Sequence, residues 1–516
     1  MRKHRDRTAF LLSVILSAGL ILRLYQLAAR DLWFDEVCSI YKARDLITYL
    51  AVDMTPPLYY VFLSFWTHIF GDSAFQARLI SVIFGTASIV LLYKLGKLLF
   101  KNKEVGLASA LILAISPIHL WYSQEARGYT FAVFAVMLTA YFFIQAVEEK
   151  KKIYWIAFTA ASTASLYSSY YYLPVILSEM AILLLIKRYR VAIKHWLISL
   201  VITGAAFLPF LGVFFYHLKS VKNNFWIDPP TIKSLFFSFG NFNVGYNASE
   251  ITYALSALFF LGLFLLGASQ AAKKHKNSLV ILLSLWLLPV LAVFVVSKVI
   301  PIYIDRHLIL YLPFYAVVIA SGIALGVRKR RVKIMLVLLL VILTLPALGN
   351  YFSGLMPAAA DRYTGTYIKK PFGPAVNYVK MNYQKDDAII HTNHATTVTF
   401  EYYWSRDSLA PTYPFAASHF FMLAENDKYW QGVVQERFAH CPAEINKELE
   451  IERNIRSRKF KRIWLISSTW NRAQGEDENS TEVKKILAKN YKAIIFKEFD
   501  GIFVTLWVLA RPVLKS

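Results

Sequence analysis

The sequence predicts a polytopic α-helical membrane protein with a small α/β domain outside the membrane. Of its 516 residues, 57% are hydrophobic and only 17% are charged. The hydrophobic residues come in runs near the ~20 residues that an α-helix needs to cross the hydrocarbon layer. Beyond residue 350 the runs give way to mixed polar and apolar residues, which is typical of a domain in water.

About eleven apolar runs have the length of membrane helices. They are expected near residues 8–29, 79–99, 104–120, 129–147, 153–169, 172–187, 195–216, 251–271, 278–298, 306–326 and 333–350. The first run follows the basic segment MRKHRDR, as in a signal peptide. It is long, however, and no small-residue cleavage site precedes RDLWFDE. We therefore expect it to remain as the first helix.

Clusters of Lys and Arg fall at every second connection between these runs. They lie at the N-terminus and at 94–103, 150–152, 187–194, 273–276 and 328–333. Because cytoplasmic loops are enriched in basic residues, the N-terminus is predicted to be cytoplasmic in a plasma (inner) membrane and the C-terminal domain external. The net charge of +24 reflects this topology and not nucleic-acid binding, because the basic residues do not gather on one face or tail.

Residues 57–70, PLYYVFLSFWTHIF, form an apolar run that is too short for a membrane span. Such a run is more typical of an interfacial or re-entrant helix. Counting it as a span also places the basic cluster at 94–103 outside, against the charge rule. Residues 30–78 are therefore predicted to form one external loop, with two or three short amphipathic helices lying on the membrane.

Two domains follow from this pattern, a transmembrane catalytic domain over 1–350 and an external soluble α/β domain over 351–516. In the second, PFGPAVNYVKMNYQKDDAIIHT predicts a helix followed by a strand. STEVKKILAKNYKAIIFKEFDGIFVTLWVL predicts a helix and two strands joined by a turn at Asp500-Gly501.

Charged residues gather close to the membrane on the predicted external side. They are Asp35, Glu36 and Asp53 in the first loop, Glu125 and Arg127 in WYSQEARGYT, and Asp305 and Arg306 in IPIYIDRHLILYLPF. Ionisable groups at the membrane boundary are costly unless they are paired or functional. Arginines bind phosphate oxygens, and a carboxylate accepts the proton of an incoming hydroxyl. Together these residues suit a transferase that uses a lipid-phosphate donor.

Each of these residues also has a simpler structural explanation. The two adjacent carboxylates of the first loop suit ion pairs with Arg30, Lys42 or Arg44. Arg127 and Arg306 suit anchoring to phospholipid headgroups, and the aspartate beside Arg306 suits a local ion pair. Aromatic clusters such as YSSYYYLP are typical of interface belts.

Five motifs resemble the GT-C superfamily of polyprenyl-phosphate-dependent glycosyltransferases, in particular the protein O-mannosyltransferase-like family with its bacterial and archaeal relatives. They are LWFDEVCS (32–39), DMTPPLYYVFLSFW (53–66), FGDSAFQARLISVIFG (70–85), SPIHLWYSQEARGYTF (116–131) and IDRHLILYLPF (304–314). The resemblance implies an inverting transfer of a sugar from a polyprenyl- or dolichyl-phosphate donor to an acceptor outside the cytoplasm.

The resemblance also implies roles for single residues. Asp35 is expected to be the base, Glu36 to support it or orient the acceptor, and Arg127 to hold the donor phosphate with Arg306 as a second contact. The residues expected to position the substrates are Asp53, Glu125, Tyr59 and Tyr129. The chemistry agrees, because inversion needs one base, and a phosphate leaving group needs charge stabilisation more than a protonating acid.

Two positions depart from the family pattern, at Thr55 and at Ser168-Ser169, where relatives often have histidine. We therefore expect no essential metal and no other cofactor. A divalent cation held by the first-loop carboxylates and the donor phosphate remains the alternative, because carboxylates suit hard cations. Cys38 and Cys441 are both predicted to be external, either bridged or as two unrelated thiols.

The main alternative function is a transporter or flippase of lipid-linked sugars without transfer chemistry. Such a protein is expected to carry charges or broken helices near the bilayer midplane, and the sequence indicates neither. A receptor or scaffold leaves the first-loop carboxylates without a task. For the transferase, the expected partners are the polyprenyl-phosphate-linked sugar donor and membrane lipids. The sugar is left open, and so is the acceptor, whether a protein hydroxyl, a lipid or an envelope glycan.

Overall fold

The computed structural model describes residues 2–47, 54–224, 227–357, 369–385, 387–405, 419–421, 460–469 and 478–510. The chain divides into two compact units. The helical unit comprises Met1–Leu27 and Lys42–Ile368, and the C-terminal unit comprises Ala28–Tyr41 and Lys369–Ser516. This division differs from the predicted boundary after residue 350, because a segment of the first loop joins the C-terminal unit.

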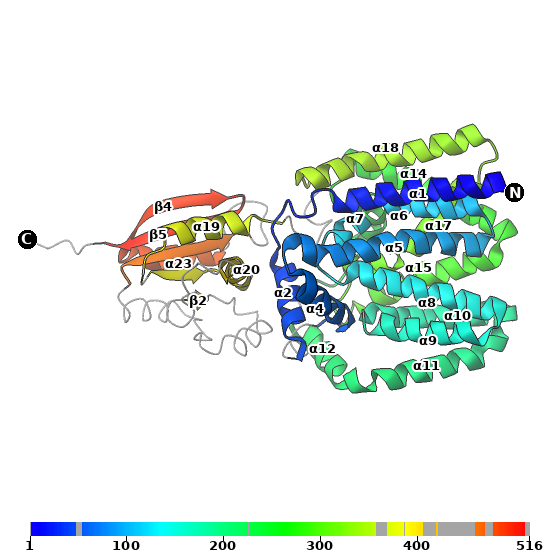
Figure 1. Ribbon diagram of the computed structural model, residues 1–516, viewed down its shortest axis with the longest axis horizontal. Helices are drawn as coiled ribbons and strands as arrows, with labels where there is room; N and C mark the ends of the chain where they lie inside the picture. Colours follow the sequence, from blue (N-terminus) through cyan, green and yellow to red (C-terminus); the bar gives the residue numbers. More distant parts are fainter. Residues whose placement is uncertain are drawn as a thin grey trace, which may run out of the picture. The chain divides into compact units, whose positions relative to one another are not determined.

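The helical unit is a bundle of apolar helices (Figure 1). Its α-helices are α1 (Arg2–Leu24), α4 (Leu58–Phe70), α5 (Ala74–Phe100), α6 (Lys103–Ile115), α7 (Pro117–Ser123), α8 (Tyr129–Glu149), α9 (Lys152–Leu166), α10 (Leu173–Leu185), α11 (Ile193–Phe207), α12 (Leu211–Asn224), α13 (Ile232–Val244), α14 (Glu250–Lys274), α15 (Lys276–Val296), α16 (Asp305–Leu308), α17 (Leu312–Leu325) and α18 (Arg330–Ser353). Four short 3₁₀ helices interrupt or extend them, η1 (Tyr170–Tyr172), η2 (Lys187–Ala192), η3 (Leu208–Phe210) and η4 (Ile309–Tyr311).

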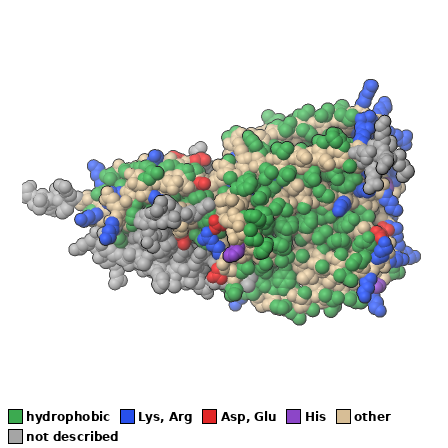
Figure 2. All heavy atoms as spheres, viewed as in Figure 1, with side chains coloured by type: hydrophobic (Ala, Val, Ile, Leu, Met, Phe, Trp, Pro, Cys, Tyr) green, Lys and Arg blue, Asp and Glu red, His purple; other side chains and the backbone are tan. Residues whose placement is uncertain are grey.

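All eleven predicted apolar runs are helical, but they are not eleven equal spans. Among the described residues, eight helices are long and apolar enough to cross a membrane, or nine if the bent pair α6–α7 is one span. The runs predicted at 153–169 and 172–187 form α9, with 15 residues, and α10, with 13 residues. The chain is thus a multi-pass membrane protein, and Figure 2 shows basic side chains gathered at the end of the helical unit where the chain begins.

α17 forms the centre of the bundle. In the apolar 18-residue window of Asp305–Leu325, 94% of the residues are buried, against 11% in the α1 segment Arg7–Leu24. α17 is apolar on all sides, as expected for a helix surrounded by other helices. A Cβ atom on Gly267 of α14 would lie 2.2 Å from the Val318 carbonyl oxygen of α17, so glycine is what lets these two helices approach closely.

Two helices form in the predicted first loop, α2 (Phe34–Arg44) and α4. α4 buries Tyr59, Tyr60 and Leu63 against its own unit, while Phe65 and Ile69 are more than half exposed. An apolar exposed face on a short helix fits the predicted position on the membrane surface. α2 begins in the C-terminal unit and ends in the helical unit.

The C-terminal unit contains a five-stranded sheet with the order β2-β1-β3-β5-β4. Its strands are β1 (Ala388–His391), β2 (His419–Phe421), β3 (Arg462–Ser468), β4 (Tyr491–Phe499) and β5 (Ile502–Leu509). β1 pairs in parallel with β2 and β3, and β5 pairs antiparallel with β3 and β4. The helices α19 (Phe372–Asn382) and α20 (His394–Ser405) pack on one face, and α23 (Glu478–Ala488) packs on the other.

The predicted elements of this unit form where the sequence places them. α19 leads to β1, and α23 leads to the hairpin of β4 and β5. Asp500 and Gly501 join the two strands with φ angles of 43° and 81°. Positive φ at both central residues matches the right-handed twist of the strands, and Asp-Gly tolerates it best.

Candidate active site

The chain breaks between α6 and α7, just before the turn that carries Arg127. Ser116 ends α6 and caps α7, because its hydroxyl accepts from the His119 N–H (3.4 Å) and Pro117 takes the first helical position. The axes of α6 and α7 differ by 61°. The run predicted as one helix over 104–120 therefore forms two helices, either a broken span or a re-entrant loop.

The buried Arg23 of α1 holds the two sides of this break together. It is fully buried, and its guanidinium donates to the Leu113 carbonyl of α6 (3.1 Å). That carbonyl lacks its ordinary helical partner, because the residue four positions later is Pro117, which has no N–H. The guanidinium also bonds His119 Nδ1 (2.9 Å) and the Ser123 hydroxyl (3.2 Å) of α7. Arg23 thus replaces the hydrogen bonds that the break removes.

Gln124, which directly follows α7, fixes the start of the turn that carries Arg127. Its amide donates to the carbonyls of Arg23 (2.9 Å) and Tyr25 (2.8 Å), and its oxygen accepts from the Tyr351 hydroxyl of α18 (2.7 Å). Glu125 follows and accepts from the Trp121 indole (2.8 Å). Both side chains are buried. Glu125, predicted to position a substrate, thus contacts the helix that leads into the turn.

The turn rests on α4 and α5. The Ser81 hydroxyl donates to the Arg127 carbonyl (3.2 Å) and lies 3.3 Å from the Tyr59 hydroxyl. A Cβ atom on Gly128 would lie 3.1 Å from the Tyr59 Cβ, so the Tyr59 side chain packs directly against the turn. Tyr59 was also predicted to position a substrate. It is 1% exposed and packs against the turn that carries Arg127.

Arg127 and Arg306 share one neighbourhood, which is centred on His307. The Arg127 guanidinium lies 5.7 Å from the Tyr129 ring centroid, and Arg306 directly precedes His307 in the chain. The Tyr171 ring stacks on that imidazole, with centroids 4.5 Å apart and planes 7° apart, and the Tyr129 ring meets its edge at 5.7 Å. The helical unit therefore brings the two predicted phosphate-binding arginines and Tyr129 together. Sequence reasoning missed His307 and Tyr171, although both lie in stretches it had singled out.

Asp305 is fastened to α13, a helix that the sequence did not predict. Its carboxylate accepts from the Ser238 hydroxyl and from the Asn241 side-chain amide (2.5 Å). The Tyr303 hydroxyl donates to the Ser238 oxygen (3.0 Å). Asp305 thus holds the segment that presents Arg306, whereas the simpler explanation from sequence was an ion pair between these two neighbours.

Two of the predicted carboxylates of the first loop, Asp35 and Glu36, lie in the C-terminal unit. Asp35, which is half-buried, and Glu36 form the first turn of α2, where acidic residues are favourable. Glu36 is fully buried and accepts from the Trp33 N–H (3.3 Å) with one oxygen. Its other oxygen pairs with the Lys369 ammonium (3.4 Å). Glu36 therefore shapes the turn that presents Asp35.

The residues before α2 are also held by the C-terminal unit. The Leu32 N–H donates to the Tyr403 hydroxyl of α20 (2.7 Å), and the Gly373 N–H of α19 donates to the Asp31 carboxylate (2.7 Å). A Cβ atom on Gly373 would lie 3.2 Å from an Asp31 carboxylate oxygen, so this contact is tight.

The other end of α2 is bound to the helical unit. Lys42 is fully buried, and its ammonium donates to the Thr55 carbonyl (2.8 Å) and hydroxyl (3.2 Å) and lies 4.0 Å from the Tyr60 ring centroid. Arg44 pairs with Asp72. Lys42 was predicted only as an ion-pair partner of the carboxylates. The structure shows it beside Thr55, one of the two positions that depart from the expected family pattern.

Some predicted residues stay untested. Asp53 and Cys441 lie outside the described residues, so the role of Asp53 and the bridge from Cys38 remain predictions. Within the described ranges, no group of three or more His, Cys, Asp or Glu residues is arranged to hold a metal ion.

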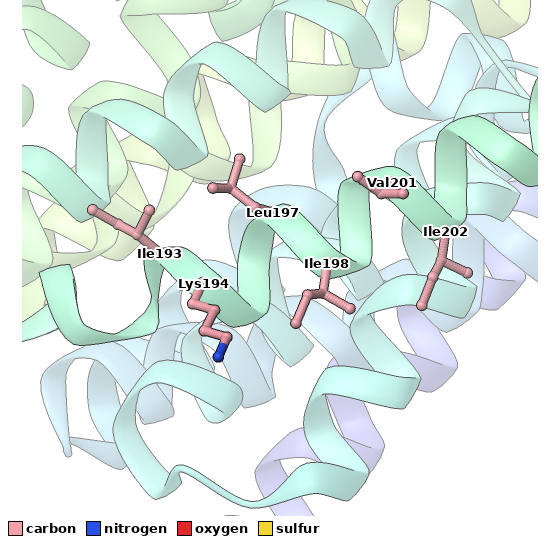
Figure 3. Close-up of a pocket in the computed structure, with 6 residues that line it drawn as sticks. All are labelled: Ile193, Lys194, Leu197, Ile198, Val201 and Ile202. Carbon is pink, nitrogen blue, oxygen red and sulfur yellow. The ribbon is translucent and has the colours of Figure 1, made fainter.

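A pocket of ≈ 460 Å³ lies elsewhere, on the surface of α11 (Figure 3). Its lining residues are Ile193, Lys194, Leu197, Ile198, Val201 and Ile202. They form two rows along one helix, and most of them are exposed aliphatic side chains of a membrane-spanning segment. Such a groove suits contact with lipid chains and offers no group for transfer chemistry.

A membrane helix bundle with two neighbouring arginines, joined to an α/β unit that carries carboxylates, has the fold of the GT-C glycosyltransferases. The structure resembles apo ArnT from Cupriavidus metallidurans, with a TM-score of 0.60 and 11% identity over 96% of this chain and 97% of that one. The same enzyme bound to undecaprenyl phosphate matches with a TM-score of 0.60 and 10% identity over the same shares. The apo oligosaccharyltransferase from Archaeoglobus fulgidus matches with a TM-score of 0.53 and 12% identity over 98% of this chain and 75% of that one.

Residues 54–216 match the family model of dolichyl-phosphate-mannose-protein mannosyltransferases. This match and the shared fold support the polyprenyl-phosphate-dependent GT-C glycosyltransferase family, and they confirm the resemblance that the motifs predicted. No curated protein matches the chain by sequence.

Proposed function

We propose that this protein is an inverting glycosyltransferase that moves a sugar from a polyprenyl-phosphate donor to an acceptor on the outer side of the membrane. The observation that carries the proposal is that the Arg127 guanidinium lies over the Tyr129 ring, and that this ring contacts the His307 imidazole beside Arg306, at the start of a membrane-spanning segment. Two arginines form a clamp for a phosphate group, and the apolar helices beside them suit a polyprenyl chain.

In this mechanism Asp35 takes the proton from the acceptor hydroxyl as its oxygen bonds to the anomeric carbon of the sugar. The bond between that carbon and the phosphate oxygen breaks, and the phosphate leaves with the electron pair. Arg127 and Arg306 stabilise the charge that develops on the leaving phosphate. One displacement inverts the anomeric centre, and no protonating acid is needed because the leaving group is already anionic.

We propose that no metal ion takes part. The buried Lys42 ammonium lies beside Thr55, and a positive charge there disfavours a cation close by. Transfer activity is then expected to survive incubation with a chelator such as EDTA. A loss of activity that added Mg²⁺ or Mn²⁺ restores would contradict this part of the proposal.

The decisive test is donor turnover. Purified protein is incubated with a panel of polyprenyl-phosphate sugars and a crude acceptor fraction, and the release of free polyprenyl phosphate is followed. Asp35→Asn removes the base and is expected to slow release on the order of 10²- to 10⁴-fold. Glu104→Gln, which changes an exposed carboxylate that pairs with Lys333, serves as the control. Equal release by wild type and Asp35→Asn would exclude Asp35 as the base.

A transporter or flippase of lipid-linked sugars is the second candidate, since the structure contains one broken membrane helix and the buried Arg23. Arg23 is, however, bonded to carbonyls and neutral side chains and has no exposed surface. Proteoliposomes with a fluorescent lipid-linked sugar separate the two functions. Movement of intact donor across the bilayer without phosphate release would favour the transporter.

A further inference from the structure

Lys369 is the first described residue of the C-terminal unit after the helical unit, and it contacts the segment that carries the carboxylates. We propose that Lys369 is a positioning residue for Asp35, acting through Glu36. This inference rests on the proposed function for its catalytic consequence. The contact itself is independent of that function.

The Glu36 carboxylate is fully buried, and the Lys369 side chain is only 8% exposed. A buried carboxylate is costly unless both of its oxygens find donors. The Lys369 ammonium pairs with one oxygen, and the Trp33 N–H donates to the other. Removing Lys369 takes a cation away from a fully buried carboxylate, and the favoured response of the segment is to move Glu36 towards water.

Such a movement also displaces Asp35. The hydrogen bond from the Trp33 N–H to Glu36 closes the first turn of α2, and Asp35 lies inside that turn. Lys369 therefore acts on the predicted base through one neighbouring residue.

Two further contacts show that this segment is built as a part of the C-terminal unit. Tyr403 and Gly373 bond the backbone of Leu32 and the side chain of Asp31. Together with Lys369, they hold the residues immediately before and within the first turn of α2. The C-terminal unit thus holds the segment that carries Asp35.

The adjacent Lys370 provides a matched control. Its ammonium lies 3.4 Å from the Gly501 carbonyl in the β4–β5 turn and is influenced by Asp500 and Glu498. Lys370→Met removes the same positive charge from the neighbouring position and keeps a side chain of similar length. It leaves the contact between Lys369 and Glu36 intact.

The experiment compares full-length Lys369→Met, Lys369→Arg and Lys370→Met by hydrogen exchange and by turnover. In Lys369→Met, the backbone amides of residues 33–41 are expected to exchange about 10-fold faster. The kcat for sugar transfer is expected to fall about 100-fold, because a small displacement of a catalytic group is enough for that loss. The KM for the donor is expected to stay unchanged, since the arginines hold the phosphate. Lys369→Arg restores both readouts, and Lys370→Met resembles wild type.

The double variant Glu36→Gln/Lys369→Met tests the charge itself. Because this variant has a neutral amide in place of the buried carboxylate, its backbone amides are expected to exchange more slowly than those of Lys369→Met. Equal exchange in Lys369→Met and Lys370→Met would overturn the proposal. A wild-type protein without transfer activity would refute the proposed function, while the exchange measurement would still decide whether Lys369 positions the segment.

Discussion

The Arg127 turn and the Asp35 segment are built in opposite ways. Within the helical unit, neutral groups contact the turn itself, namely the Gln124 amide, the Tyr351 hydroxyl and the Ser81 hydroxyl, while the charged Arg23 bonds both sides of the helix break before it. The Asp35 segment belongs to the C-terminal unit and depends on a buried ion pair. The proposed phosphate site and the proposed base thus depend on different kinds of contact.

Among the variants that test this comparison, the largest effect is expected at the Arg127 turn. In the proposed mechanism Arg127→Met removes a charge that stabilises the leaving phosphate, so kcat/KM for the donor is expected to fall about 10²- to 10³-fold. Measured donor binding should weaken in this variant, while Asp35→Asn should bind donor as wild type does. Arg44→Met, which removes a half-exposed arginine from its surface pair with Asp72, is the control and should retain activity. Normal donor binding by Arg127→Met would separate Arg127 from the phosphate site.

The next effect concerns the support of the turn. Arg23→Met leaves the Leu113 carbonyl, His119 and Ser123 without their shared donor inside the bundle. The free energy of unfolding in detergent is expected to fall by about 3 kcal/mol, because several buried polar groups lose a partner together. Ser278→Ala, which removes a single hydrogen bond to the Leu99 carbonyl, should cost about 1 kcal/mol. Equal losses in the two variants would mean that Arg23 does not close the break.

The smallest expected effect is a pH dependence of stability that Lys370 of the C-terminal unit contributes. Burial lowers the pKa of Lys370, against the opposing influence of Asp500 and Glu498. A folded-state pKa below the unfolded one means that the unfolded chain binds more protons between the two values. Stability is therefore expected to rise as the pH rises through that interval, which ends near the ordinary lysine value. Thermal unfolding of full-length protein from pH 8 to 11 measures the slope. Lys370→Met should have a flatter one, and a matching slope would assign the effect to another group.

Local sequence patterns predicted much of the architecture. Apolar runs placed α5, α8 and α14, because a helix in lipid must satisfy its own backbone hydrogen bonds and therefore needs a continuous apolar stretch. Asp500-Gly501 placed the hairpin of the C-terminal unit, because few residues tolerate two successive positive φ angles. The family motifs also identified Arg127 and Arg306, which the structure brings to one neighbourhood.

Long-range contacts decided the rest. Nothing local to Arg23 indicates that it bonds a carbonyl ninety residues away, and nothing near Asp305 indicates its partners on α13. Local sequence does not indicate the bend between α6 and α7 either, because a proline such as Pro117 is found at a helix start as readily as at a break within a span.

The sequence by itself therefore determined that this protein is a membrane helix bundle with an α/β unit and which charged residues deserve testing. Hydrophobic length, helix periodicity and turn chemistry are properties of neighbouring residues, so a sequence displays them directly. Only the tertiary structure decided that Ala28–Tyr41 belongs with the C-terminal unit, and that Glu36 pairs with Lys369. Burial and pairing depend on residues that are distant in the chain and close in space, and the cost of an unpaired buried charge makes those partners specific.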